Sequence, residues 1–243
     1  MGNPTTVEIA VQDPAGARIA FAAGADRVEL CQALGVGGLT PSIGTVELTI
    51  EAAGDAARVA PLVRPRPGGF VYDTDEVAVV TADIQALTSA GVGAVVVGCL
   101  TASGDVDIDA LRRCRDAAAG AELVFHRAID AAPAPVRVLE SLRENGVTRV
   151  LTSGGATRAV DGLPLLADFA ARGGIQIMAG GGVRPEDIPA LCAAGIDAVH
   201  LSARATSPST DPSGPGGGVA GFDVTDSDIV HAAVAAARGA TVT

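Results

Sequence analysis

The sequence predicts a single (β/α)8 barrel, and three observations carry this prediction. The chain has 243 residues, which is close to the usual length of such a barrel. Short β-branched segments alternate with loops and alanine-rich amphipathic segments along the chain, as in a parallel sheet covered by helices. Several helical segments end in glycine just before the next strand, in AAGADRV, SAGVGAV, ENGVTRV and AAGIDAV, where a left-handed residue turns the chain.

Eight segments have the composition of strands that are covered on both faces, because they are short and almost continuously apolar. In chain order they are Val7–Val11, Arg27–Cys31, Pro61–Pro65, Ala94–Cys99, Glu122–His126, Arg149–Ser153, Ile175–Ala179 and Ala198–Ser202. Helices are predicted between them, among them Pro14–Ala23, Asp75–Ala90 and Asp109–Ala119. A doubly wound open sheet is the structural alternative, but no GxGxxG motif follows the first strand, as that fold would require for a dinucleotide.

Two loops differ from the others in being rich in glycine, proline and serine, namely Gly35–Gly44 and Ser207–Gly221. Such composition is typical of turns and mobile segments. The second is predicted to be a flexible loop, with disorder favoured over a lid. No segment has the composition of a domain linker, so residues 1–243 are predicted to form one domain.

The charge and the cysteines restrict the partners and the compartment. The formal charge is −11, from 28 acidic and 17 basic residues, which argues against a nucleic-acid partner. A few arginines in a cleft can still attract a small anion. The four cysteines have no CxxC spacing, as expected for a reduced cytoplasmic protein. Neither a signal peptide nor an apolar run of membrane-spanning length is visible, so we expect a soluble protein with no membrane partner.

Ionisable and hydroxyl residues are concentrated in and just after the predicted strands, and function in this fold sits at the carboxyl ends of the strands. These residues are Glu8, Glu29, Arg64, Arg66, His126, Arg127, Asp130, Thr152, Ser153, His200 and Ser202. Burying so many polar groups costs free energy unless they are paired. One interpretation is a set of structural ion pairs, with Glu8 and Glu29 against Arg64, Arg66 and Arg127. A ligand-binding or catalytic site is favoured, because all the groups converge on one rim.

The candidate acids and bases of such a site are carboxylates and imidazoles, which move protons near neutral pH when their surroundings adjust the pKa. They are Glu8, Glu29, His126, Asp130 and His200.

Anion binding is predicted for a second set of residues. Arg64 and Arg66 are two positions apart, so on a regular strand they would share one face and could grip a carboxylate or phosphate together. Glycine-rich turns after the sixth and seventh strands would let backbone N–H groups approach the same anion. The whole set is Arg64, Arg66, Arg127, Thr152, Ser153, Gly154, Gly180, Gly181, Gly182 and Ser202.

Soft metal ligands are scarce. Thiolate, thioether and imidazole are the donors that suit Cu(I), so Cys31 and Met178, both in predicted strands, are the candidate metal ligands. The alternative, which the residues alone favour, is that Cys31 is a small buried apolar residue.

Six segments resemble the CutC family of copper homeostasis proteins, and the matches run in order from about Val7 to His200. The segments are GADRVELC (Gly24–Cys31), GGLTPSIG (Gly37–Gly44), RPRPGGFVY (Arg64–Tyr72), FHRAID (Phe125–Asp130), RVLTSGG (Arg149–Gly155) and IMAGGGV (Ile177–Val183). The resemblance implies a cytoplasmic, homo-oligomeric (β/α)8 barrel that is linked to copper tolerance and binds Cu(I). The family cysteine is present as Cys31. The first strand, VEIAVQD, has no cysteine where many relatives carry one, and Ala10 and Val11 cannot ligate copper.

Three functions are compatible with these observations. The first is a copper-handling protein that uses Cys31 and Met178, the role that the resemblance favours. The second is an enzyme that performs acid–base chemistry on a small, sugar-like, phosphorylated or carboxylated anion. Physical chemistry favours the second, because a guanidinium group repels a metal cation and cannot ligate it. On the resemblance, copper homeostasis is the principal prediction and the enzyme is its alternative. The third is a scaffold whose rim only stabilises an oligomer.

Overall fold

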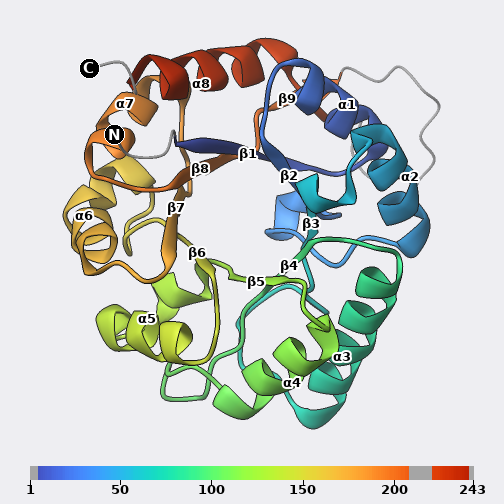
Figure 1. Cartoon of the computed structure of the whole chain (residues 1–243), viewed down its shortest axis with the longest axis vertical. Coiled ribbons are helices and arrows are strands. Elements are labelled where there is room, and N and C mark those ends of the chain that lie inside the picture. The colour runs from blue at the N-terminus through green and yellow to red at the C-terminus, as the bar shows by residue number, and fades with distance from the viewer. Residues whose placement is uncertain (1–4, 208–220, 241–243) are drawn as a thin grey trace.

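The chain folds as a closed ring of parallel strands surrounded by helices (Figure 1). Residues 5–207 and 221–240 are described by the computed structural model. Eight strands form one sheet in the order β3-β2-β1-β8-β7-β6-β5-β4, and a parallel bridge between Leu62 and Val96 joins its two ends. The predicted (β/α)8 barrel is confirmed.

Strands and helices alternate along the chain. The barrel strands are β1 (Thr6–Val11), β2 (Arg27–Leu30), β3 (Val59–Pro61), β4 (Ala94–Val97), β5 (Glu122–Phe125), β6 (Arg149–Thr152), β7 (Gln176–Gly180) and β8 (Ala198–Leu201). The α-helices are α1 (Pro14–Ala22), α2 (Ile43–Ala53), α3 (Thr74–Ser89), α4 (Ile108–Ala118), α5 (Pro135–Glu144), α6 (Leu163–Arg172), α7 (Ile188–Ala193) and α8 (Ser227–Ala240). Short 3-10 helices are η1 (Leu34–Val36), η2 (Ala56–Arg58), η3 (Arg127–Ala131), η4 (Ala159–Gly162) and η5 (Pro185–Asp187). N-caps fix several helix starts; at α1, the Asp13 carboxylate accepts from Gly16 N at 2.7 Å, as expected for this residue type.

The third strand lies earlier in the chain than the sequence predicts. The prediction is Pro61–Pro65, whereas the strand is Val59–Pro61. Arg64 N donates to a threonine side chain outside the sheet, and Pro65 has no N–H with which to continue the ladder. Arg64 and Arg66 therefore lie in a loop and not on a regular strand.

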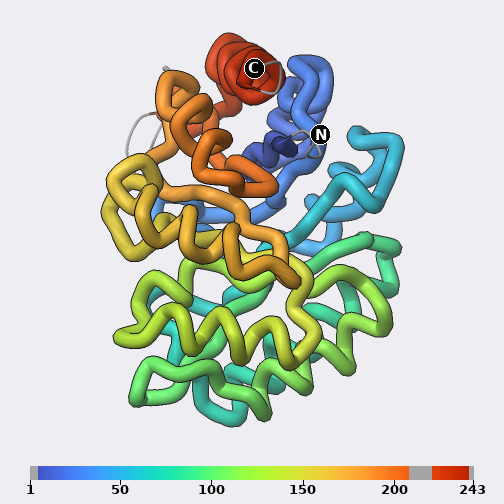
Figure 2. The backbone as a smooth tube through the Cα atoms, turned by 60° about the vertical axis from the view of Figure 1, so that its left-hand side comes forward, coloured from blue at the N-terminus to red at the C-terminus, as the bar shows by residue number. Residues whose placement is uncertain are grey.

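The first and last units of the chain close the barrel. β1 pairs in parallel with both β2 and β8, and α8 packs against α7 and β1. Figure 2 shows α8, in red, beside the blue N-terminal units. This closure makes Glu8 and His200 direct neighbours, because they are partners in the β1–β8 register.

A small hairpin follows the barrel. β9 (Arg204–Ser207) and β10 (Phe222–Thr225) pair antiparallel, with Ser207 opposite Phe222. The sequence predicts only a flexible loop over Ser207–Gly221. The ends of that loop belong to or adjoin the hairpin, and residues 208–220 lie outside the described part of the chain.

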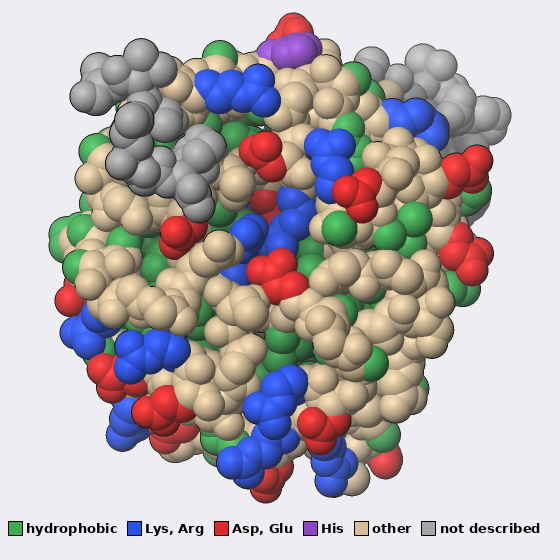
Figure 3. All heavy atoms as spheres, viewed as in Figure 1, with side chains coloured by type: hydrophobic (Ala, Val, Ile, Leu, Met, Phe, Trp, Pro, Cys, Tyr) green, Lys and Arg blue, Asp and Glu red, His purple; other side chains and the backbone are tan. Residues whose placement is uncertain are grey.

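The interior of the barrel is packed. Its apolar layer consists of Cys31, Ala60, Leu62, Ala94, Val96, Val124, Leu151, Met178 and Ala198. At the amino ends of the strands, Arg27 donates to Glu8 and, at 2.7 Å, to Glu122 across the barrel. Charged side chains of both signs gather at the barrel centre on the face drawn in Figure 3. None of the described helices is long and apolar enough to cross a bilayer.

Candidate functional site

A cavity of about 480 Å³ opens at the carboxyl ends of the barrel strands. Its polar lining residues are Glu29, Arg64, His126, Arg127, Asp130 and His200. Its apolar walls include Leu34, Val36, Leu62, Phe70 and Leu151. The structure thus brings six of the residues singled out from the sequence into one cavity, whose size suits a small organic molecule.

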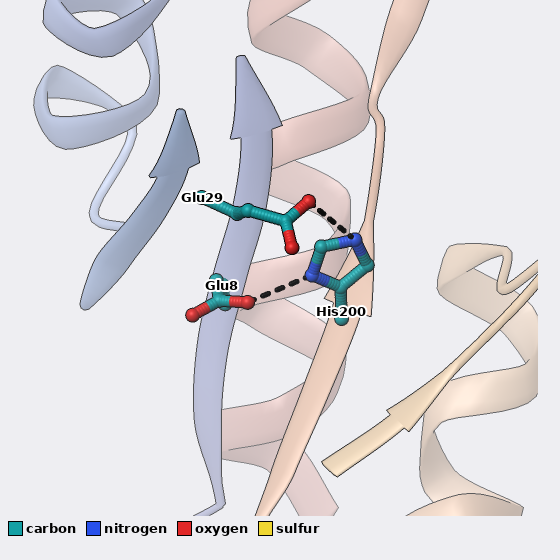
Figure 4. Close-up of side chains that lie close together, drawn as sticks. All are labelled: Glu8, Glu29 and His200. Carbon is teal, nitrogen blue, oxygen red and sulfur yellow. Dashed lines mark hydrogen bonds and ion pairs between the residues drawn. The ribbon is translucent and has the colours of Figure 1, made fainter. Parts of the chain in front are cut away.

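Three ionisable side chains from adjacent strands, Glu8, Glu29 and His200, lie close together beside this cavity (Figure 4). The Oε1 atom of Glu8 lies 2.8 Å from His200 Nδ1, and Glu8 Oε2 accepts a hydrogen bond from Arg27. His200 Nε2 lies 3.8 Å from Glu29 Oε2. The carboxyl of Glu29 is buried and makes no hydrogen bond within the described residues. His200 is therefore held by Glu8 on one side and faces Glu29 on the other.

The electrostatics give these three groups different roles. Burial alone would raise the pKa of Glu8, but Arg27 and His200 bring this pKa down to about 2, so Glu8 stays ionised. Burial raises the pKa of Glu29, and the charge of Glu8 adds to this rise against the opposing effect of His200. Burial lowers the pKa of His200, but Glu29 and Glu8 outweigh it, so the net direction is upward. Glu29 and His200 thus act on the protonation of each other, with His200 opposing the rise at Glu29 and Glu29 contributing to the rise at His200.

These atoms also lie within 4.8 Å of one another, a spacing that a metal ion could bridge. However, both oxygens of Glu8 already serve Arg27 and His200, and the guanidinium of Arg27 repels a cation. The arrangement suits the orientation of an imidazole better than the binding of a metal.

His126 is a neutral imidazole in the wall of the cavity. Its Nδ1 accepts a hydrogen bond from Ala128 N at 3.1 Å, so the ring proton is on Nε2. Burial, and then the positive charge of Arg64, lower the pKa of His126 to about 3. The Nε2 atom is buried and has no hydrogen-bond partner in the part of the chain that the structure describes.

Arg64 is a buried cation without a carboxylate partner among the described residues. Only 7% of the residue is exposed. Its Nη1 donates to the carbonyls of Val36, Gly37 and Gly38 at 3.2–3.3 Å, and its Nη2 donates to Gly68 O at 2.6 Å. Carbonyl dipoles hold the guanidinium in place but leave its unit charge unneutralised, which favours an anion in the cavity.

Asp130 organises the opposite side of the cavity. Its carboxylate accepts from Arg127 Nε at 2.8 Å, from Thr152 Oγ1 at 2.5 Å, and from both the N–H and the hydroxyl of Ser153, at 3.0 and 2.9 Å. Arg127 also donates to Ser153 Oγ at 3.0 Å. Asp130 is predicted as an acid or base, but its lone pairs are occupied, so the structure favours a positioning role. Thr152 and Ser153 support Asp130 and are absent from the cavity wall.

Comparison with known proteins agrees with this architecture. The CutC family profile matches residues 5–205. The chain belongs to the CutC family. It is 42% identical to a CutC family protein of Agrobacterium fabrum over 212 residues, covering 86% of this chain and 83% of that protein. It is 39% identical to a CutC family protein of Aliivibrio fischeri, covering 84% and 83%.

A solved structure of the family superimposes on the same barrel. The crystal structure of CutC from Streptococcus agalactiae, which is described as a copper homeostasis protein, matches with a TM-score of 0.76 and 30% identity. The match covers 82% of this chain and 98% of the Streptococcus agalactiae chain.

In this CutC family member, Arg64 and Arg66 do not form a paired grip. The two residues are predicted to point to one face, but the side chain of Arg66 pairs with Glu76 at the start of α3. Arg66 is absent from the cavity wall, and so is Ser202, which borders a separate small pocket beside Gln12. Arg64 and Arg66 are expected to share a face because side chains alternate along a strand. Both residues lie in the loop after β3, where this alternation does not hold. The alternative interpretation, in which Glu8 and Glu29 form ion pairs with Arg64, Arg66 and Arg127, does not describe the structure, because Glu8 pairs with Arg27.

The four predicted anion-binding glycines pack closely against other groups and do not line the cavity. A Cβ at Gly180 would lie 2.5 Å from Leu151, and one at Gly154 would lie 2.4 Å from a backbone carbonyl oxygen. Gly181, at a φ of +112°, leaves room for the guanidinium of Arg127, and Gly182 has a φ of +58°. Their anion-binding role stays a prediction.

Cys31 and Met178 are fully buried in the apolar layer of the barrel and are absent from the cavity wall. Burial, assisted by the negative charge of Glu29, raises the pKa of the Cys31 thiol.

Two residues of the site, Arg27 and Phe70, are not predicted from the sequence. Arg27 anchors Glu8, and its signal is its place two positions before Glu29, on the same face of β2. Phe70 lies between functional groups, with its ring centroid 4.9 Å from that of His126 and 5.3 Å from Arg64 Cζ. No sequence pattern places a loop aromatic there.

Proposed function

We propose that this protein is an enzyme that performs acid–base chemistry on a small organic anion at the carboxyl end of the barrel. One observation carries the proposal. The buried cation of Arg64 lines the same cavity as the carboxyl of Glu29. Within residues 5–207 and 221–240, Arg64 has no carboxylate partner and the Glu29 carboxyl makes no hydrogen bond. A buried unneutralised charge is costly unless a ligand compensates it.

The cavity supplies the parts that such an enzyme needs. Arg64, assisted by Arg127, attracts a carboxylate or a phosphate. Glu29 is the proton acceptor, and it lies next to His200, whose ring is held in place by Glu8. The apolar walls contributed by Leu34 and Leu151 exclude water from the reacting atoms.

Binding should depend on Arg64 and not on Arg66. Isothermal titration calorimetry with inorganic phosphate and with 2-phosphoglycolate is expected to show that Arg64→Met weakens binding at least about tenfold, because a charged hydrogen bond contributes about 1.5–3 kcal/mol. Arg64→Lys keeps the positive charge but loses the paired N–H donors of the guanidinium, so its affinity for the probes should lie between those of Arg64→Met and wild type. Arg66→Met is the matched control and should keep the affinity of wild type, since its guanidinium pairs with Glu76.

Two outcomes would contradict this site. One is the absence of binding by either probe to the wild-type protein. The other is equal affinity in wild type and both Arg64 variants, with thermal unfolding confirming that the variants are folded.

Copper handling is the role that the description of the Streptococcus agalactiae relative suggests. In this chain the soft donors Cys31 and Met178 are packed in the apolar layer, and the raised pKa of Cys31 disfavours the thiolate that binds copper. The cavity itself offers carboxylate, imidazole and guanidinium groups, which make a poor Cu(I) site. We therefore favour an organic anion over Cu(I) as the ligand of this cavity.

Copper titration separates the two functions. In anaerobic competition with bicinchoninate, wild type and Cys31→Ser are expected to have the same weak affinity for Cu(I), because the buried thiol does not contribute. Tight binding by wild type that is lost in Cys31→Ser would support copper handling instead.

Cytoplasmic location and assembly into a homo-oligomer stay predictions. The four cysteines are all free thiols, three of them buried, which supports a reducing compartment.

A further inference from the structure

We propose that the cavity catalyses proton abstraction from the carbon next to a carbonyl group, with Glu29 as the base and His126 Nε2–H as the donor to the carbonyl oxygen. The substrate class is then a small aldehyde or ketone that carries a phosphate or carboxylate. This inference rests on the proposed function and adds to it the reaction and the role of His126.

The first support is the unpartnered N–H of His126. The ring is fixed on three sides: Ala128 N donates to Nδ1, Phe70 lies against it at 4.9 Å, and a Cβ at Gly98 would lie only 2.1–2.8 Å from its atoms. Such packing fixes the ring, yet its buried Nε2 donor has no acceptor among the described residues. A buried donor left unpaired costs about 1–3 kcal/mol, and the carbonyl oxygen of a ligand in the cavity would remove that cost.

The second support is the protonation state of His126. Because burial and Arg64 bring its pKa to about 3, the ring keeps a single proton and cannot act as an imidazolium near neutral pH. A neutral imidazole that donates from one nitrogen can polarise a carbonyl and stabilise the oxyanion that develops from it.

The third support is the position of Glu29. Its carboxyl makes no hydrogen bond within the described residues and lines the same cavity as His126. His200 lies next to Glu29: its Nε2 is 3.8 Å from Glu29 Oε2, and its Nδ1 is 2.8 Å from Glu8 Oε1. A carboxylate whose pKa is raised by burial is a stronger base than an exposed one, and His200 can take up or return the proton that Glu29 removes.

The step balances without a co-reactant. Glu29 takes the proton of the carbon next to the carbonyl, and the electron pair of that C–H bond forms a C=C bond. The π pair of the carbonyl moves to its oxygen, which accepts a hydrogen bond from His126 Nε2 near the charge of Arg64. Return of a proton to the same carbon, after Glu29 has exchanged its proton with water, gives exchange with solvent. Isomerisation of an α-hydroxy substrate returns the proton to the former carbonyl carbon and also moves the hydroxyl proton to the former carbonyl oxygen; His126 can carry this second proton by donating Nε2–H to one oxygen and taking the proton of the other.

Hydrogen–deuterium exchange tests the step. Pyruvate, hydroxypyruvate and dihydroxyacetone phosphate are incubated with the protein in D2O, and loss of the α-proton signal is followed by proton NMR, with binding measured in parallel by calorimetry. Wild type is expected to accelerate exchange in at least one probe. Glu29→Gln should slow it at least about 100-fold, and His126→Leu should slow it by a similar factor, with probe affinity changed only a few-fold. Glu47→Gln, on the exposed face of α2, is the matched control and should exchange at the wild-type rate.

The outcomes separate this inference from the proposed function. If a probe binds in an Arg64-dependent manner but no probe exchanges, or if exchange is unchanged in Glu29→Gln, the inference is overturned and the anion site stands. If no probe binds the wild-type protein, the anion site fails and the inference fails with it. Glu29→Gln keeps the size of the side chain and removes no hydrogen bond, so its result can be interpreted even if His126→Leu does not fold.

Discussion

Replacement of Glu8 by alanine is expected to lower the free energy of unfolding by about 3–5 kcal/mol, the usual effect of removing one member of a buried ion pair. Glu8 is 1% exposed and neutralises Arg27, which itself is 8% exposed. Without Glu8, the Arg27 charge keeps only Glu122, and His200 loses the acceptor of its Nδ1–H. The loss should also disorder His200 beside Glu29, because nothing else in the described residues holds the His200 ring by a side-chain hydrogen bond.

Chemical denaturation followed by circular dichroism measures this effect; the chain has no tryptophan for fluorescence. The matched control is Glu140→Ala, which removes one of the two carboxylate partners of Arg172 on the outer surface and should change stability little, because exposed pairs contribute little. A Glu8→Ala loss no larger than that of the control would show that the buried pair is not needed for stability.

Lowering the pH should reduce the free energy of unfolding of the wild-type protein by more than it reduces that of the His126→Leu variant. The pKa of His126 is about 3 in the folded protein and 6.5 as its ordinary value, so below pH 6.5 the unfolded chain binds a proton that the folded chain does not. The stabilising contribution of the neutral ring is complete above pH 6.5 and is lost as the pH falls towards 3. Between pH 6.5 and pH 5 the difference amounts to about 2 kcal/mol.

The measurement is the free energy of unfolding of both proteins at several pH values. Arg64 and Asp130, which also act on His126, are present in both proteins, and so are Glu29 and His200, so their own contributions largely cancel in the difference. Parallel pH profiles for wild type and His126→Leu would mean that His126 titrates normally and that the neutral imidazole assigned to the site is incorrect.

Much of the barrel follows from local patterns in the sequence. Short apolar segments, a capped helix after each, and glycine before the next strand are properties of neighbouring residues, so they are visible without the fold. The rule that strand ends converge then places Glu29, His126, Arg127 and His200 at one rim. Their meeting in the cavity follows from topology alone.

The partners of these residues could not be predicted, because they depend on side-chain direction and loop path. Arg66 is two positions from Arg64, yet it turns outward to Glu76, because both residues lie in the loop after β3 and not on the strand. Arg27 reaches across the barrel to Glu122 on β5, a contact between strands that are not neighbours in the sheet. Asp130 is a local neighbour of Arg127, but its four contacts with Thr152 and Ser153 exist only once β5 and β6 are side by side.

If the cavity at the carboxyl end of the barrel binds a small organic anion through Arg64, a crystal structure of the wild-type protein with 2-phosphoglycolate should show that ligand in place. We expect it in this cavity, with an anionic group at Arg64 and an acceptor oxygen within hydrogen-bond distance of His126 Nε2. A ligand bound only outside the cavity, at a concentration that saturates binding in solution, would mean that Arg64 does not form the anion site.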